Sequence, residues 1–226
     1  MEPIAVDFPL RGEWIAPNTP GYIIPSHGTD LLAQTYAYDF LQINWRYPKR
    51  LWYFEKSYFL ALFIGVRLKE CMCWSQSIYA PFSGDIVESL DGIKERDPVH
   101  FIREQYEGIK NRILFKKHKI SNLDILLGNH IILRGSHCFA LFAHLHTNSI
   151  SAKLGNKVKI GEKIAEVGHS GNSSGPHLHF QLMDGLSIEH AKGLPCCFRE
   201  YEVFEEGVWR KVINGIPGRY ERIRVI

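Results

Sequence analysis

Residues 173–182, Ser-Ser-Gly-Pro-His-Leu-His-Phe-Gln-Leu, alternate polar and apolar side chains, and this alternation strongly restricts what the chain can fold into. Successive side chains of a β-strand point to opposite faces of the sheet. One face of a strand here would carry His177, His179 and Gln181. The other face would carry residues typical of a core: Leu178, Phe180 and Leu182. The two imidazoles would lie about 6.5–7 Å apart along the strand, which suits one histidine that binds a metal ion and a neighbour that acts on water there.

Short strands separated by glycine turns are predicted along much of the remaining chain. They fall at residues 35–43, 77–87, 129–133, 138–145 and 157–168. Closely spaced short strands are typical of an all-β sandwich or barrel. We therefore predict a mainly β fold.

Two segments interrupt the strand pattern and are predicted to be insertions. Residues 44–76 are rich in aromatic side chains without regular alternation, which indicates some helix. In residues 94–122, Asp97-Pro98 resembles the start of a helix. Apolar residues then recur at helical spacing to about Lys117: Val99, Ile102, Tyr106, Ile109 and Ile113. This pattern predicts an amphipathic surface helix, and we treat residues 1–226 as one domain carrying both insertions.

The net charge of +3 over 226 residues is small. It permits a weak preference for anionic surfaces, but no basic run with interleaved aromatic residues predicts nucleic-acid binding. The first residues lack the basic start and apolar run of a secretory signal. The longest apolar run, residues 58–66, is too short to cross a bilayer, so no transmembrane segment is expected.

The chain has five cysteines, an odd number that rules out a complete set of intrachain disulfides. We expect most of them to be small buried apolar residues in a reducing compartment. A thiolate metal site on Cys71 and Cys73 is disfavoured, because no second cysteine pair follows at a suitable spacing.

A catalytic zinc site needs three protein ligands and an open position. His179 is the first candidate, and His27 is the second, because it ends a short apolar run and is followed by glycine. The third ligand should be a carboxylate. Asp39 lies in an aromatic strand, where an unpaired carboxylate is costly, whereas Asp30 lies in a polar turn that would suit any aspartate. This contrast favours Asp39.

One further histidine, His144, lies in an alternating stretch that would place it on one face with Phe142 and His146 and near the same cleft. The remaining histidines are expected to have no role in the site, with His146 the closest to an exception. They are residues 100, 118, 130, 137, 146, 169 and 190.

The C-terminal half resembles the lysostaphin-type (LytM-like) zinc metallopeptidases. The resemblance rests on residues 79–87, 142–145, 157–164 and 167–180, and covers roughly residues 27–182. The combined run that ends in His177-Leu178-His179-Phe180 is highly specific, whereas an isolated His-x-His would not be.

The resemblance implies an antiparallel β-sandwich with an open groove, the duplicated hybrid motif of that family. It implies that His27, Asp39 and His179 bind one Zn²⁺ and that His144 and His177 are catalytic histidines that do not bind it. Many members place the aspartate four residues after the first histidine, whereas Asp39 follows His27 by twelve residues. Residues 36–40 nevertheless resemble the family's aspartate-bearing strand.

By resemblance, the expected activity is zinc-dependent hydrolysis of peptide bonds in peptidoglycan stem peptides or cross-bridges. One of His144 and His177 would take a proton from water, and the other would hydrogen-bond the developing oxyanion. The main alternative is a non-hydrolytic peptidoglycan-binding or regulatory module on the same fold. A histidine-based group carrier is disfavoured because it would leave Asp39 without a purpose. The implied substrate points to the cell envelope or the exterior, whereas the N-terminus and cysteines point to the cytoplasm.

Overall fold

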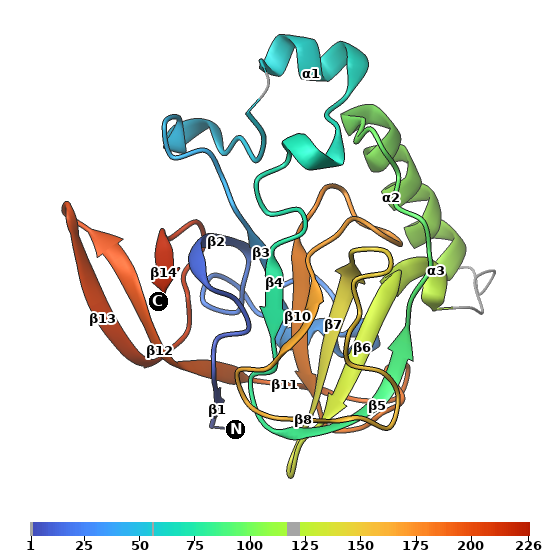
Figure 1. Ribbon diagram of the computed structural model, residues 1–226, viewed down its shortest axis with the longest axis vertical. Coiled ribbons are helices and arrows are strands. Elements are labelled where there is room, and N and C mark those ends of the chain that lie inside the picture. The colour runs from blue at the N-terminus through green and yellow to red at the C-terminus, as the bar shows by residue number, and fades with distance from the viewer. Residues whose placement is uncertain (1, 56, 117–122) are drawn as a thin grey trace.

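The computed structural model describes residues 2–55, 57–116 and 123–226 (Figure 1). Among these residues, twelve strands form one large sheet. Ten of them follow each other across it in the order β1 (Ile4–Val6), β12 (Cys196–Glu205), β14 (Ile223–Val225), β2 (Gly12–Asn18), β3 (Tyr38–Leu41), β10 (Leu178–Met183), β7 (Phe139–Leu145), β6 (Asn129–Arg134), β5 (Gly84–Leu90) and β8 (Lys157–Val158). Two more pair at the side, β11 (Gly193–Leu194) with β10 and β13 (Val208–Gly215) with β12. The neighbours pair antiparallel except for β1 and β12, and the predicted mainly β fold is confirmed.

A small second sheet, β4 (Ser77–Tyr79) with β9 (Lys163–Glu166), packs over the large sheet. Ile78 of β4 and Ile164 of β9 share one buried cluster with Phe142 of β7 and Phe180 of β10. Apolar burial of this kind is the main driving force for stacking sheets. The main core therefore lies between the two sheets.

The alternation predicted for residues 178–182 is confirmed. Leu178, Phe180 and Leu182 lie in the main core, whereas Met183 belongs to a smaller cluster on the opposite face of the large sheet. The odd-numbered side chains of β10 thus point away from the main core. His179 and Gln181 consequently lie on the opposite face.

The predicted common face of Phe142, His144 and His146 is wrong. Phe142 is in the main core, whereas His144 stacks near His177, with ring centroids 4.8 Å apart. The cause is a left-handed backbone at His144, with a φ of 63°, where the pairing of β6 with β7 is also irregular. This backbone breaks the alternation and turns the imidazole to the other face.

The first insertion contains α1 (Tyr58–Ile64) and short 3₁₀ turns at Pro48–Arg50 and Leu68–Glu70. A small cluster of its own holds it together: Phe54, Ala61, Val66, Leu68 and Cys71 pack with Val99. The strand predicted at residues 35–43 is shorter than expected, because a 3₁₀ turn at Leu31–Tyr36 precedes β3.

The second insertion contains α2 (Phe101–Lys116), which is followed by α3 (Asp124–Leu127). The helix begins after the predicted Asp97-Pro98 start, because the backbone of Val99 pairs with that of Val66 and is not free to turn. Lys117 lies outside the described residues.

The apolar stripe of α2 does not face the core as an amphipathic helix would predict. Ile102 is 72% exposed, and Tyr106 and Ile109 are also exposed, whereas Glu104 is buried. A polar network described below holds the helix instead. No helix within the described ranges is long and apolar enough to span a bilayer.

All five cysteines are free and buried, as expected. Cys73 donates its Sγ–H to the carbonyl of Pro176 over 2.9 Å, and burial raises its pKa to about 12. Such a thiol is a poor metal ligand, because binding requires the thiolate.

Candidate metal centre

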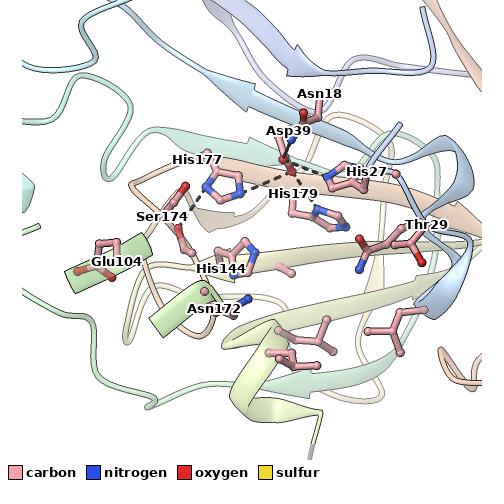
Figure 2. Close-up of a pocket in the computed structure, with 18 of the residues that line it drawn as sticks. Asn18, His27, Thr29, Asp39, Glu104, His144, Asn172, Ser174, His177 and His179 are labelled. Carbon is pink, nitrogen blue, oxygen red and sulfur yellow. Dashed lines mark hydrogen bonds and ion pairs between the residues drawn. The ribbon is translucent and has the colours of Figure 1, made fainter. Parts of the chain in front are cut away.

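The carboxylate of Asp39 lies at the centre of a cluster of histidines (Figure 2). Antiparallel pairing of β3 with β10 places Asp39 directly opposite His179. Oδ1 of Asp39 is 2.9 Å from Nδ1 of His179, and Oδ2 is 3.0 Å from Nε2 of His27. One ligand atom from each of these three residues lies within 4.8 Å of the others. The structure therefore brings together the three residues expected to bind the metal.

Hydrogen bonds behind the two imidazoles fix their orientation. The Ser26 hydroxyl donates to the Ala37 carbonyl over 2.7 Å, so its oxygen accepts the Nδ1–H of His27. The Gln181 amide donates to the Leu32 carbonyl over 2.9 Å, so its Oε1 accepts the Nε2–H of His179. These tautomers are assigned from the hydrogen-bond partners.

In these tautomers, the lone pairs of His27 Nε2 and His179 Nδ1 both point toward the Asp39 carboxylate. Two imidazole lone pairs and a carboxylate that face one point repel each other unless a cation lies between them. Two nitrogens and one oxygen are also a donor set that Zn²⁺ accepts in open sites. The residues therefore fit a bound zinc ion.

The environment of Asp39 favours its charged form. Its side chain is 14% exposed, and Asn18 donates to Oδ2 over 2.7 Å. Burial opposes ionisation, but positive charge at this point, either on the neighbouring His27 and His177 or on a bound cation, would hold the pKa of Asp39 well below its usual range. By contrast, Asp30 lies in an exposed turn, where its Oδ1 accepts the hydroxyl hydrogen of Thr35.

Two further histidines, His144 and His177, lie beside this cluster. His144 donates its Nδ1–H to the Ser170 carbonyl over 3.0 Å, and His177 donates its Nδ1–H to the Gly175 carbonyl over 2.7 Å. Each ring therefore keeps Nε2 as an acceptor. Nε2 of His177 is 3.5 Å from Oδ1 of Asp39. Burial, and then the neighbouring His177 and His179, lower the pKa of His144 well below its ordinary value, so its imidazole is neutral.

The cluster opens into a groove of about 640 Å³. One wall comes from the loop and turn after His27, with Thr29, Leu31 and Leu32. The other wall comes from α2, with Gln105 and Ile109. The second insertion therefore shapes the space in front of the candidate metal centre.

The loop that carries His177 is tied to α2. Arg96 donates to the carbonyls of Gly171 and Ser173 over 2.7 and 2.9 Å, and its Nε donates to the buried carboxylate of Glu104 over 2.7 Å. The same carboxylate accepts from Arg103 over 2.7 Å. Burial would raise the pKa of Glu104, but the contacts with His169, Arg103 and Arg96 lower it to about 2.

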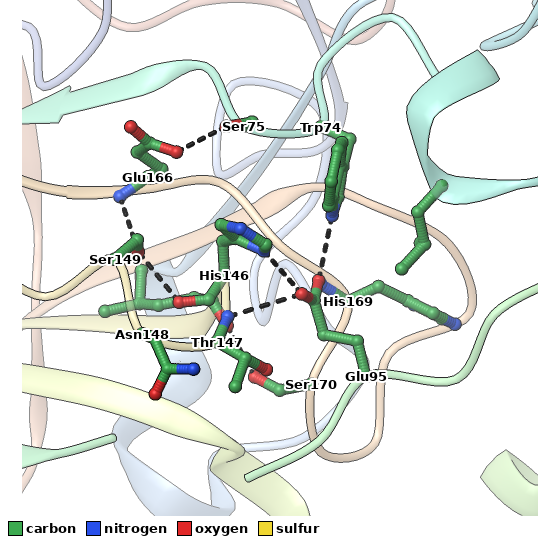
Figure 3. A network of polar contacts seen from close by, with 12 residues as sticks. Trp74, Ser75, Glu95, His146, Thr147, Asn148, Ser149, Glu166, His169 and Ser170 are labelled. Atoms are coloured by element: carbon green, nitrogen blue, oxygen red, sulfur yellow. Dashed lines mark hydrogen bonds and ion pairs between the residues drawn. The ribbon is translucent and has the colours of Figure 1, made fainter. Parts of the chain in front are cut away.

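A second buried carboxylate, Glu95, organises the neighbouring strand end (Figure 3). It accepts from Trp74 Nε1 over 3.0 Å and from the backbone of His169 over 2.7 Å, and it pairs with Nδ1 of His146 at 2.5 Å. His146 and His169, expected to have no role in the site, thus belong to polar networks that support the site loops. His118 lies outside the described residues.

Three residues that support the site have no prediction from the sequence: Asn18, Ser26 and Glu104. The alternation of β10 predicts the correct face for Gln181 but not its contact with His179. The sequence carries no signal for Glu104, because it lies on the polar side of the helical pattern, opposite Ile102 and Tyr106. It carries none for Asn18 or Ser26 either, since their contacts depend on how distant segments pack.

Residues 113–190 match the model of peptidase family M23. An "uncharacterized metalloprotease" of Buchnera aphidicola subsp. Baizongia pistaciae is 36% identical over 74 residues, which cover 33% of this chain and 19% of that protein. Peptidoglycan DD-endopeptidase ShyB of Vibrio cholerae is 34% identical over 71 residues, which cover 31% of this chain and 15% of that protein.

The chain thus spans less than a fifth of the length of these curated relatives. Among solved structures, Csd3 of Helicobacter pylori aligns with a TM-score of 0.40 at 14% identity, over 84% of this chain and 32% of that chain. The family match includes His144, His177 and His179, whereas His27 and Asp39 precede it. Over residues 113–190, the chain is therefore similar to peptidase family M23.

Proposed function

We propose that the protein is a zinc-dependent metalloendopeptidase that hydrolyses peptide bonds in peptidoglycan stem peptides or cross-bridges. The observation that carries this proposal is the convergence of His27 Nε2, His179 Nδ1 and the Asp39 carboxylate on one point. The family match over residues 113–190 and the relatives named as a metalloprotease and a peptidoglycan DD-endopeptidase support the class of reaction.

In this proposal, His27, Asp39 and His179 hold one Zn²⁺. A bound zinc ion would polarise the scissile carbonyl and lower the pKa of a coordinated water to about 7. Hydrogen bonds from His27 to Ser26 and from His179 to Gln181 keep the two imidazoles in the ligating orientation.

His144 and His177 would perform the proton transfer and the stabilisation of the oxyanion. Each has its Nδ1–H engaged by a backbone carbonyl and its Nε2 free. One of them would take the proton of the attacking water at Nε2, and the other, when it is protonated at Nε2, would donate toward the developing oxyanion. The groove between Leu32 and Ile109 would hold the peptide in front of them.

The test measures zinc per chain and peptide release from purified peptidoglycan. We expect His179→Ala to lose both zinc and activity. His177→Ala should keep its zinc and lose about 10²–10⁴-fold in rate, the usual contribution of a general acid or base. His137→Ala is the matched control because His137 is exposed in the turn between β6 and β7, at the opposite end of β7 from His144.

Full activity of His177→Ala would refute the assigned roles. A wild-type chain that takes up no zinc but still binds peptidoglycan would instead favour the non-hydrolytic binding or regulatory module.

A further inference from the structure

The first insertion presents an apolar helix to solvent. In α1, Phe59 is 73% exposed and Phe63 is 66% exposed, and Leu60, Leu62 and Ile64 are exposed as well. Figure 1 shows α1 at one end of the molecule, away from the large sheet. An exposed apolar patch of this kind on a folded domain marks an interaction site.

The exposed residues surround most of this helix. At 100° per residue, Leu62, Phe59, Phe63, Leu60 and Ile64 span an arc of about 200°. Among the side chains of α1 that the structure describes, Ala61 is the one that packs into the insertion's own cluster. A partner helix or a protein groove contacts one face of a helix, whereas a lipid surface can surround such an arc.

Basic and aromatic side chains flank the helix on both sides. Lys49 and Arg50 precede it and Arg67 and Lys69 follow it, and all four are exposed. The Arg50 guanidinium lies 4.9 Å from the centre of the Trp52 ring and 5.7 Å from that of Tyr47. Tryptophan, tyrosine and snorkelling cations are the residues that populate the headgroup region of a bilayer.

The charge of the first insertion indicates what kind of surface it would bind. Residues 44–76 contain six basic and two acidic side chains, a net charge of +4, while the whole chain has +3. Residues 94–122 also carry a net charge of +4, from eight basic and four acidic side chains. The attraction to an anionic surface would therefore come from the exposed basic residues that flank α1, and not from a unique excess of charge in this segment. A second copy of the same surface would place like charges together, whereas anionic lipid headgroups would attract each basic residue.

We propose that the first insertion docks on an anionic lipid surface, with α1 lying among the headgroups and its basic neighbours on the anionic groups. The combination of apolar, aromatic and basic residues is that of an interfacial anchor rather than a membrane span.

The anchor also borders the candidate metal centre. Tyr53 lines a hollow of about 190 Å³ together with Gly175, Pro176 and His177. Docking would therefore hold the mouth of the site close to the membrane. The lipid contact itself does not depend on hydrolysis.

The experiment is sedimentation with vesicles of equal parts phosphatidylglycerol and phosphatidylcholine, compared with vesicles of phosphatidylcholine alone. Wild-type protein should sediment with the anionic vesicles. Phe59→Ser combined with Phe63→Ser should reduce binding at least about tenfold, since two exposed aromatic rings no longer partition. Lys49→Glu combined with Lys69→Glu should remove the preference for anionic vesicles.

The matched control is Val208→Ser combined with Ile213→Ser, which removes two exposed apolar residues from β13 and should leave binding unchanged. The proposal is overturned if the wild type ignores anionic vesicles, or if the control loses as much binding as the α1 variant. Gel filtration provides a third check. The proposal is also overturned if wild-type protein sediments with vesicles only as a dimer and the α1 variant no longer forms that dimer. Zinc content and peptide release, measured on the same variants, report separately on the proposed function.

Discussion

Oε2 of Glu104 lies 3.5 Å from Nε2 of His169, and both side chains are fully buried. Nδ1 of His169 is 3.0 Å from Oγ of Ser173, which lies 3.2 Å from Nδ1 of His177. A carboxylate on the inserted helix α2 thus approaches the histidine proposed to act in catalysis through His169 and Ser173, and its contact with His169 is an ion-pair distance without a hydrogen bond. The second insertion therefore contacts the loop that carries His177, in addition to lining the groove.

Glu104→Gln should lower the free energy of unfolding by about 2–4 kcal/mol, because Arg96 and Arg103 lose their buried carboxylate. It should also lower kcat more than it raises KM, since the loop of His177 loses its support while zinc content is unchanged. Urea unfolding and steady-state kinetics test both effects. Glu107→Gln on the same helix breaks only the partly exposed pair with Lys110 and should leave the free energy of unfolding almost unchanged. Equal losses in the two variants would contradict the assignment.

Low pH should reduce the contribution of Glu104 to the free energy of unfolding. The pKa of this carboxyl falls from its ordinary 4.5 to about 2 in the folded protein, so the folded state favours the charged form. Its stabilisation is present above about pH 4.5 and disappears as the pH falls through about 2, and its full size is about 3 kcal/mol. Unfolding of wild type and Glu104→Gln across this range tests the expectation. Their difference should shrink with acid, and a difference that is constant or grows toward low pH would show that charge is not its origin.

Asp39→Asn should abolish stabilisation of the fold by zinc. With free Zn²⁺ at a hundred times its Kd, wild-type protein should gain about 2.7 kcal/mol in unfolding free energy. The asparagine amide provides no anionic oxygen between His27 and His179, so the Asp39→Asn variant should gain little unfolding free energy from Zn²⁺. Chemical unfolding with and without Zn²⁺ measures both gains. Asp30→Asn, in the exposed turn, is the control and should behave as wild type, and a loss of the gain in that variant would transfer the ligand role to Asp30.

Gln181→Leu should weaken zinc binding about 10–100-fold, because the Nε2–H of His179 loses the acceptor that orients its ring. Titration against a zinc chelator measures the change. Gln181→Glu keeps an acceptor for His179 and loses only the donor to Leu32, so it should retain most of the affinity. If the Glu variant binds zinc as weakly as the Leu variant, the hydrogen bond to His179 is not what supports the ligand.

The sequence predicts features that depend on local periodicity. The alternation of residues 177–182 places Gln181 and His179 on one face and Phe180 in the core, and the structure agrees. The glycine-separated strands predict the mainly β fold for the same reason. The preference for Asp39 over Asp30 came from the cost of an unpaired carboxylate in an aromatic strand, and Asp39 is indeed the carboxylate beside His27 and His179.

Predictions from local sequence patterns are wrong where the backbone of one residue departs from the regular geometry of its strand, or where ion pairs orient a helix. The left-handed backbone at His144 reverses the alternation of β7, so that Phe142 and His144 face opposite ways. Helix α2 is oriented by the ion pairs of Glu104 rather than by its apolar stripe, because buried charges must be paired wherever their partners lie. The boundaries of the insertions, and the roles of the five site residues, stay predictions.

By itself the sequence determined which residues alternate, and therefore the strands and the chemical types available to the site. Only the tertiary structure decided which of those residues meet. The register of β3 against β10 joins Asp39 to His179 across 140 positions, and the packing of α2 joins Glu104 to His169. Local propensity extends over a few residues, whereas these contacts are selected by burial and charge pairing between segments far apart in the chain.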